Sequence, residues 1–337
     1  MAIRILDSTV INRIAAGEVI ERPASAVKEL AENSLDAGST QIDISIRDGG
    51  QSLIVVRDNG CGMSRDDLIL SVERHATSKL VDNDLMNIST RGFRGEALAS
   101  IAAVAQVELK TKMADDIVGQ QLTIDGGKFI EQTECQTAVG SNFVVKNLFF
   151  NIPARRNFLK NDQVEQKHII DEIERLAIPH TDIHFTFQSN GNEVLNIPQG
   201  NLIQRIKSLI GSYIQKELVQ INEDTTFVKI KGYVSLPESA VKTKKEQYFF
   251  VNNRFVKNPF LNHAVYEAYK DLIGYQSHPR YFLFLEMDPK NIDINIHPTK
   301  TEVKCVSDRL KLICETRSLD LSGGPGKTQC FSMGPNE

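Results

Sequence analysis

The sequence predicts an α+β protein of two domains: a two-layer α/β sandwich over residues 1–200 and a smaller α/β domain over residues 202–318. Segments with apolar residues spaced by three and four alternate with segments in which apolar residues recur at every second position. These are the patterns of helices and strands. The sequence IPQGN, near residues 198–202, interrupts them and marks the domain boundary. Residues 319–337 show neither pattern and are expected to be a flexible tail or linker.

The first domain is predicted to begin with two helices. Ser8 or Thr9 caps the first helix, and Pro23 ends it and takes a favoured first position in the next. The expected elements are helices over 9–22 and 24–38, strands over 41–47 and 52–58, a helix over 64–74, a loop over 75–95, a helix over 96–105, strands up to about residue 150, a loop over 151–160, a helix over 162–177 and a hairpin over 184–197. A loop as long as 75–95 is usually functional.

The second domain is predicted from the same two patterns. The expected elements are a helix over 201–212, strands over 227–236 and 247–256, a helix near 260–273, a strand over 281–288 and the extended segment 294–304.

The composition excludes several classes of protein. Among 337 residues, 39 are basic and 43 are acidic, so the net charge of −4 excludes a strongly basic nucleic-acid coat, although a local basic groove is compatible with it. No apolar run reaches the roughly 18–20 residues of a membrane span, and the first residues lack a signal-peptide pattern. The five cysteines are dispersed, so reduced thiols in an intracellular protein are expected.

The strongest chemical signal combines one helix with two glycine-rich turns. Glu29 and Asn33 lie one turn apart on the face of the predicted second helix opposite its apolar stripe. Asp58-Asn59-Gly60-Cys61-Gly62 follows a strand, and its glycines let the main chain approach a flat ligand. The segment 92–98 places glycines before a helix N-terminus, which favours a phosphate chain. In this order the parts predict a nucleotide-hydrolysing site.

Each signal alone also has a simpler interpretation. A Glu/Asn pair on a helix is usually a solvated face, and a single DxGxG is usually a turn. GGPGKT at 323–328 lacks the first glycine of a P-loop, because that position is Leu321. His180 and His184 lie in an expected strand, so metal binding is not expected there. Cys61 is interpreted as a small buried residue rather than a nucleophile.

The same residues resemble a known family. The matching motifs are NSLDAG at 33–38, DNGCGM at 58–63, HATSK at 75–79, GFRGEAL at 92–98, NLFFNIPARRNFLK at 147–160, VNNRFVKNP at 251–259 and HPTKTEV at 297–303. In this order they resemble the N-terminal region of the MutL DNA mismatch-repair family, over residues 1 to about 304. That family shares its ATPase fold with gyrase, the ninety-kilodalton heat-shock chaperones and histidine kinases. The resemblance implies a left-handed crossover, like that of ribosomal protein domain 2, in the second domain.

The resemblance also implies roles for individual residues. Glu29 resembles the general base that activates water, and Asn33 resembles the magnesium ligand. Asp58 resembles the acceptor of the adenine amino group. The remaining implied ATP contacts are Gly60 and Gly62 beneath the base, Thr77 and Lys79 at the start of a lid, Gly92, Phe93, Arg94, Gly95, Glu96, Ala97 and Leu98 around the triphosphate, Ser141 where the family has threonine, and Lys300, which reaches the γ-phosphate from the second domain.

The function implied is that of a slow Mg²⁺-dependent ATPase switch in mismatch repair. ATP would order the 75–95 lid and the N-terminal arm (about 1–20), two chains would then pair, and hydrolysis would reset them. The implied cofactors are ATP and Mg²⁺, with room for a monovalent cation. The implied partners are DNA bound without sequence specificity, a MutS-type mismatch-recognition protein, a strand-nicking endonuclease, a helicase and a second copy of the chain. No membrane is involved, and the bacterial cytosol or nucleoid is the expected location.

Two other functions stay open at this stage. The chain could be a non-catalytic module that binds nucleotide and DNA, or another ATPase of the superfamily such as a chaperone. Family members continue into a C-terminal dimerisation domain, so either a fragment or a naturally short form is expected.

A DNA groove is suggested by two separate groups of basic residues. The candidate contacts are Arg155, Arg156, Arg254 and Lys257. Such groups are often only solvated faces, but the resemblance favours phosphate contacts that salt would weaken.

Overall fold

The computed structural model describes residues 7–77, 95–224, 228–287, 292–293 and 304–305. The first half contains α1 (Ser8–Val19), α2 (Pro23–Asp36), β1 (Gln41–Arg47), η1 (Asp48–Gly50), β2 (Leu53–Asp58), α3 (Arg65–Leu70), α4 (Ala97–Val104), β3 (Gln106–Lys112), β4 (Gly119–Asp125), β5 (Lys128–Cys135), β6 (Gly140–Lys146), α5 (Pro153–Phe158), α6 (Asp162–Ala177), β7 (His184–Ser189) and β8 (Asn192–Ile197).

The second half follows without a long break. It contains α7 (Leu202–Ile210), η2 (Ser212–Lys216), β9 (Leu218–Asp224), β10 (Lys229–Ser235), η3 (Pro237–Ser239), β11 (Gln247–Val251), β12 (Arg254–Val256), α8 (Pro259–Tyr269), β13 (Tyr281–Glu286), β14 (Ile292–Asp293) and β15 (Lys304–Cys305).

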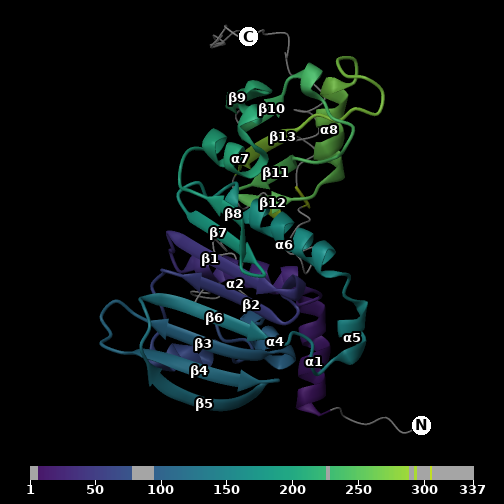
Figure 1. Cartoon of the computed structure of the whole chain (residues 1–337). Coiled ribbons are helices and arrows are strands. Elements are labelled where there is room, and N and C mark those ends of the chain that lie inside the picture. The colour runs from purple at the N-terminus through teal and green to yellow at the C-terminus, as the bar shows by residue number, and fades with distance from the viewer. Residues whose placement is uncertain (1–6, 78–94, 225–227, 288–291, 294–303, 306–337) are drawn as a thin grey trace, which may run out of the picture.

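An eight-stranded sheet forms one layer of the first domain (Figure 1), with strand order β5-β4-β3-β6-β2-β1-β7-β8. Within this sheet only β1 and β7 pair in parallel, so the sheet is mixed. Along β1, Ile42, Ile44 and Ile46 are buried at every second position. Helices α2 and α4 pack on the sheet, with α6 beside α2 and α1 beside α4. The predicted α/β sandwich is confirmed.

Local sequence explains the bounds of helix α2. Pro23 lies in its first turn, where a missing amide hydrogen costs no hydrogen bond. The helix ends at Asp36, and Gly38 has a φ of +72°, a left-handed conformation that glycine adopts without strain. Both ends of α2 are therefore set by its own sequence.

The second domain is built on a five-stranded sheet with order β12-β11-β13-β10-β9. Strands β11 and β13 are parallel, so α8 between them forms a crossover connection. Leu261 and Val265 of α8 belong to the same apolar core as Phe249 and Leu283 of those strands. The predicted second α/β domain is confirmed, and the left-handed sense of its crossover stays a prediction.

Some predicted elements were wrong in detail. Residues 151–160, expected as a loop, contain helix α5, because Pro153 is well placed in a first helical turn. The helix expected over 64–74 ends at Leu70. The strand expected over 247–256 is a hairpin, since Asn252 and Asn253 both have positive φ and reverse the chain. Strand β9 was not predicted.

A buried arginine joins α7 to the end of the first domain. Arg205 is 1% exposed, and its guanidinium donates to the carbonyl oxygens of His180 (2.9 Å), Ile183 (2.6 Å) and Ile197 (3.3 Å). Burial lowers the pKa of Arg205 to about 10, an effect that Asp182 opposes. The guanidinium therefore stays charged near neutral pH and satisfies main-chain acceptors next to the predicted boundary.

Helix α6 lies between the two sheets and contacts the second domain. The Tyr248 hydroxyl on β11 donates to Oε2 of Glu174 at 2.6 Å. The Arg175 guanidinium lies over the Phe255 ring of β12, 4.6 Å from its centroid. Apolar residues extend this contact; they include Ile178, Ile206, Ile214, Phe250 and Phe282.

In the part of the chain that the structure describes, no helix combines the length and apolarity of a membrane span.

The Glu174 contact predicts a pH-dependent stability. Burial raises the pKa of the Glu174 carboxyl, an effect that the Tyr248 hydrogen bond opposes. Because the folded-state pKa is raised, this group contributes stability below the ordinary pKa of a glutamate, and the contribution is lost as pH rises through the raised pKa. We expect Glu174→Gln to raise the melting temperature increasingly from pH 5 to pH 8, because glutamine keeps an acceptor for Tyr248 without a buried charge. Thermal unfolding of both proteins over this pH range tests it, and equal melting temperatures at pH 8 would contradict it.

Candidate active site

The Asp58 carboxylate is the centre of a buried hydrogen-bond network. Asp58 ends β2 and is 6% exposed. Ser34 of α2 donates its hydroxyl to Oδ2 at 2.8 Å, while the main-chain amides of Gly60 and Ser141 donate to Oδ1 at 2.9 and 3.2 Å. Three donors from a helix, a turn and strand β6 therefore fix the orientation of one carboxylate. Asp58, Gly60 and Ser141 were predicted site residues, whereas Ser34 was not predicted.

Thr111 on β3 continues this network. Its hydroxyl accepts from the Met63 amide at 2.9 Å, donates to the Gly140 carbonyl at 3.0 Å and lies 3.2 Å from the Ser141 hydroxyl. Thr111 is fully buried, so these contacts satisfy a hydroxyl that has no access to water. Thr111 was also missed, because an alternating strand such as β3 gives no sign that one threonine faces a site.

The glycines of the turn after β2 are required by packing. Gly62 has a φ of +72°, and a Cβ atom there would lie 2.2 Å from the Lys112 carbonyl oxygen. A Cβ on Gly60 would lie 2.8 Å from the Ala37 carbonyl oxygen. The amide of Cys61 donates to that same carbonyl at 3.0 Å, which attaches the turn to the end of α2. The expectation that Cys61 is buried is wrong: its amide faces inward and its thiol is exposed.

The polar face of α2 is enclosed rather than solvated. The Glu29 side chain is 17% exposed and Glu32 is 7% exposed. The Lys28 ammonium lies 3.9 Å from Oε1 of Glu29. Burial lowers the pKa of Lys28, but the carboxylates of Glu32, Glu29 and Glu172 together raise it above its ordinary value. Glu29 and Asn33 thus lie on an acidic helix face with a charged lysine beside it.

The start of α4 meets the end of the segment that follows α3. The His75 amide donates to the Gly95 carbonyl at 3.0 Å, and His75 Nδ1 lies 3.5 Å from Oε1 of Glu96. Gly95 has a φ of +60°, and a Cβ there would lie 2.3 Å from the Ala76 carbonyl oxygen. Glu96 precedes the helix without capping it through its side chain. Five predicted contacts lie outside the described residues: Lys79, Gly92, Phe93, Arg94 and Lys300.

The structure brings the described candidates to one region of the first domain. Asp58, Gly60 and Gly62 form the turn that is attached to α2, Ser141 begins β6 beside Asp58, and Glu29 and Asn33 lie on α2 itself. Ala97 and Leu98 open α4, which also contacts α2. Thr77 directly follows the His75–Gly95 contact. Among the described residues there is no group of three or more His, Cys, Asp or Glu side chains suited to a metal ion.

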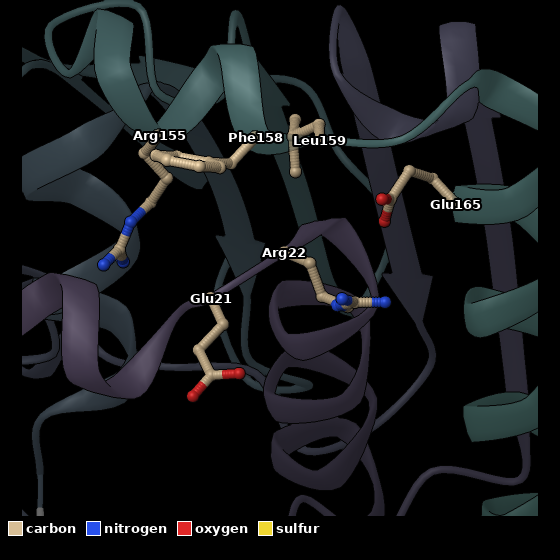
Figure 2. A pocket seen from close by; sticks show the side chains of 6 residues that line it. All are labelled: Glu21, Arg22, Arg155, Phe158, Leu159 and Glu165. Atoms are coloured by element: carbon tan, nitrogen blue, oxygen red, sulfur yellow. The ribbon is translucent and has the colours of Figure 1, made fainter.

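A pocket of about 280 Å³ lies elsewhere, between the α1–α2 connection and helices α5 and α6. Figure 2 shows Glu21 and Arg22 on that connection, Arg155 and Phe158 from α5, and Glu165 on α6. None of the predicted nucleotide contacts lines this pocket. Glu165 accepts from the Lys160 amide at 3.0 Å, which fixes the start of α6 relative to α5.

Two of the arginines predicted to contact DNA have other environments. Nη1 of Arg155 donates to the carbonyl oxygens of Gly17 and Ile20 (2.9 Å to Ile20), at the C-terminal end of α1. Arg254 lies at the interface of the two domains, within electrostatic range of Glu32 and Asp36. Both side chains are partly buried, whereas Arg156 and Lys257 are exposed. The exposed pair is therefore better placed for a DNA contact.

Two family models match this chain, one on each half. The model described as "Histidine kinase-, DNA gyrase B-, and HSP90-like ATPase" matches residues 20–142, and "DNA mismatch repair protein, C-terminal domain" matches residues 206–313. The chain is 53% identical over 303 residues to the DNA mismatch repair protein MutL of Christiangramia forsetii, and 52% identical to that of Flavobacterium psychrophilum. Each alignment covers 90% of this chain and 49% of the relative. The chain belongs to the MutL family.

Solved structures agree with this assignment. A crystal structure of the N-terminal domain of a DNA repair protein matches with a TM-score of 0.79 at 26% identity, covering 90% of this chain and 95% of that one. The Aquifex aeolicus MutL ATPase domain complexed with ADP matches with a TM-score of 0.64 at 26% identity, covering 80% and 94%. This chain spans about half the length of the curated MutL relatives it matches, and its residues 20–142 match the ATPase family model.

The Asp58 network predicts the effect of removing one donor. Ser34→Ala leaves a buried carboxylate oxygen without the Ser34 hydroxyl, which should lower the free energy of unfolding by about 1–3 kcal/mol. Ser208→Ala is the matched control, because Ser208 is exposed and, like Ser34, donates to the carbonyl four residues earlier. Urea unfolding of the three proteins provides the measurement. Equal losses in both variants would show that the Asp58 contact adds nothing to stability.

The Arg155 contacts predict a difference between two neighbouring arginines. Arg155→Ala removes a charged donor from two carbonyls at the end of α1, so we expect a loss of about 1–3 kcal/mol in unfolding free energy. Arg156→Ala removes an exposed side chain and should change it by less than about 0.5 kcal/mol. Denaturant unfolding distinguishes them, and the opposite order would contradict the placement of Arg155.

Proposed function

We propose that this chain is an Mg²⁺-dependent ATPase that acts as a slow switch in DNA mismatch repair. Residues 1–200 would bind and hydrolyse ATP, residues 202–318 would transmit the bound state, and residues 319–337 would be a tail or linker. The observation that supports this most strongly is the fixed Asp58 carboxylate next to the enclosed acidic face of α2. Membership of the MutL family and the ATPase family model support the same function.

Asp58 is suited to recognise the adenine base. A carboxylate has about four lone-pair sites, and three of them receive donors from Ser34, Gly60 and Ser141. The remaining site can accept the adenine amino group. Gly60 and Gly62 have no side chains that would obstruct a flat base above the turn. Ser141 adds a hydroxyl beside Asp58, in the place where the family has threonine.

Glu29 is suited to activate the attacking water. Its carboxylate is mostly enclosed, the Lys28 ammonium lies 3.9 Å from Oε1, and a carboxylate held in this way can accept the proton of an attacking water. Asn33 lies one turn later and offers a carboxamide oxygen, a hard donor of the kind that Mg²⁺ accepts alongside phosphate oxygens and water. Bound Mg²⁺ would neutralise charge on the β- and γ-phosphates. Thr77 and the segment 92–98, with Lys79 nearby, would enclose the triphosphate, and Lys300 would reach the γ-phosphate.

Switching requires that ATP favour one conformation over another. ATP would bind the paired, closed state more tightly than the open state, which shifts the population toward pairs of chains. Hydrolysis would remove that preference. On DNA, the paired state would recruit a MutS-type mismatch-recognition protein, a nicking endonuclease and a helicase. Of the four candidate cations, Arg156 and Lys257 are the exposed ones, and they would contact phosphates without reading sequence.

The proposal predicts that Glu29→Ala keeps ATP binding and loses hydrolysis. Removal of a general base typically lowers the rate about 10²–10⁴-fold. The proposed contact between Asp58 and the adenine ring does not involve Glu29, so ATP affinity should be unaffected. ATP affinity is measured by calorimetry, and turnover is measured against protein concentration with and without single-stranded DNA. A wild-type turnover rate per chain that rises with protein concentration supports pairing of two chains.

The outcomes separate the two main candidate functions. Undiminished turnover in Glu29→Ala would exclude Glu29 as the base. Nucleotide binding without any wild-type turnover would instead identify a non-catalytic binding module. Arg156→Ala serves as the control, because it should weaken DNA binding most at low salt and leave DNA-free turnover unchanged.

A further inference from the structure

Arg254 is a charged residue of the second domain that faces the first. It begins β12 and pairs with Val251 across the hairpin turn. Burial lowers the pKa of its guanidinium, and the carboxylates of Glu32 and Asp36 on α2 oppose that effect. Both carboxylates belong to the first domain. Arg254 is therefore placed across the domain interface from α2, although its sequence context suggested a DNA contact.

The carboxylates facing Arg254 lie on the same side of α2 as the proposed catalytic residues. At 100° per residue, Glu29, Glu32, Asn33 and Asp36 fall within an arc of about 100°. Glu32 follows Glu29 by three positions, and Asp36 follows Asn33 by three. A charge that attracts Glu32 and Asp36 consequently acts on the helix face that presents Glu29 and Asn33.

Direct contacts hold the Arg254 hairpin against the first domain. Phe255, the next residue, lies under the Arg175 guanidinium of α6, and Arg175 forms an ion pair with Glu172 at 2.5 Å. Tyr248 on the other strand of the hairpin donates to Glu174 at 2.6 Å. Helix α6 in turn packs along α2. These contacts place the hairpin beside α2 through α6, and Arg254 then lies within electrostatic range of Glu32 and Asp36.

From this geometry we propose that Arg254 is a positioning residue for ATP hydrolysis, which holds the second domain on the acidic face of α2. The inference rests on the proposed ATPase function and assigns Arg254 no contact with ATP or DNA. Through this attraction the second domain is held in a fixed position relative to Glu29 and Asn33. The adenine is proposed to bind Asp58, whose donors are Ser34, Gly60 and Ser141 and do not include Arg254, so the catalytic rate should depend on Arg254 more than nucleotide affinity does.

The test compares Arg254→Gln and Arg254→Lys in the full chain without DNA. We expect Arg254→Gln to lower kcat about 10-fold or more while the Kd for ATP changes less than about 3-fold, and Arg254→Lys to recover part of the rate because it keeps the charge. In a Glu32→Gln/Asp36→Asn background, Arg254→Gln should have no further effect on the rate. Lys229→Gln is the matched control, since it removes an exposed cation paired with Asp224 in the same sheet.

A second measurement does not depend on turnover. Hydrogen exchange of the nucleotide-free proteins should become faster in α2 and in the β11–β12 hairpin of Arg254→Gln, and stay unchanged in β3, β4 and β5. Absence of wild-type turnover would reject the proposed function, and the exchange result would still decide the position of Arg254. Unchanged exchange, an unchanged kcat in Arg254→Gln, or a full effect in the Glu32→Gln/Asp36→Asn background would each overturn the inference.

Discussion

The hydrogen bonds to Asp58 are the constraint on which the rest of the first domain depends. A buried carboxylate is tolerated only when donors surround it, and here they come from α2, from the turn after β2 and from the start of β6. The same contacts bring the helix with Glu29 and Asn33 next to the glycine turn. Stability and the proposed recognition of adenine therefore depend on the same hydrogen bonds, because the donors that satisfy the Asp58 carboxylate also fix its orientation.

The acidic face of α2 illustrates how the second domain matters to the first. A helix face with four polar residues would be exposed to water if α2 were a surface helix. Instead Lys28, helix α6 and the hairpin with Arg254 surround it, and Glu32 is almost fully buried. Charged groups enclosed in this way interact more strongly than they would in water. The second domain thus contributes to the environment of the proposed catalytic helix.

Much of the fold was predictable because its signals are local. The alternation in β1, the proline of α2 and the Asn-Gly turn of the β7–β8 hairpin each determine structure within a few residues. Ser34, Thr111 and the structural role of Arg155 were not predictable, since their partners lie 24 or more residues away in the sequence. The carboxylates near Arg254 were hidden for the same reason. A cluster of cations is visible in a sequence, but the carboxylates that face it are not.

The domain interface combines favourable and unfavourable groups, and this bears on switching. Tyr248 and Arg175 make specific polar contacts across it, yet burial of the Glu174 carboxylate opposes docking at neutral pH. Beside these groups lies an apolar cluster that includes Ile178 and Phe250, so the interface is mixed. Polar interfaces within a chain commonly permit the domains to move, whereas large apolar ones resist movement. A nucleotide can shift an equilibrium only by its difference in affinity for the two states, so states of similar free energy respond to a modest difference. Glu174 is one group whose environment would change in such a movement, because it would leave its buried position beside Tyr248.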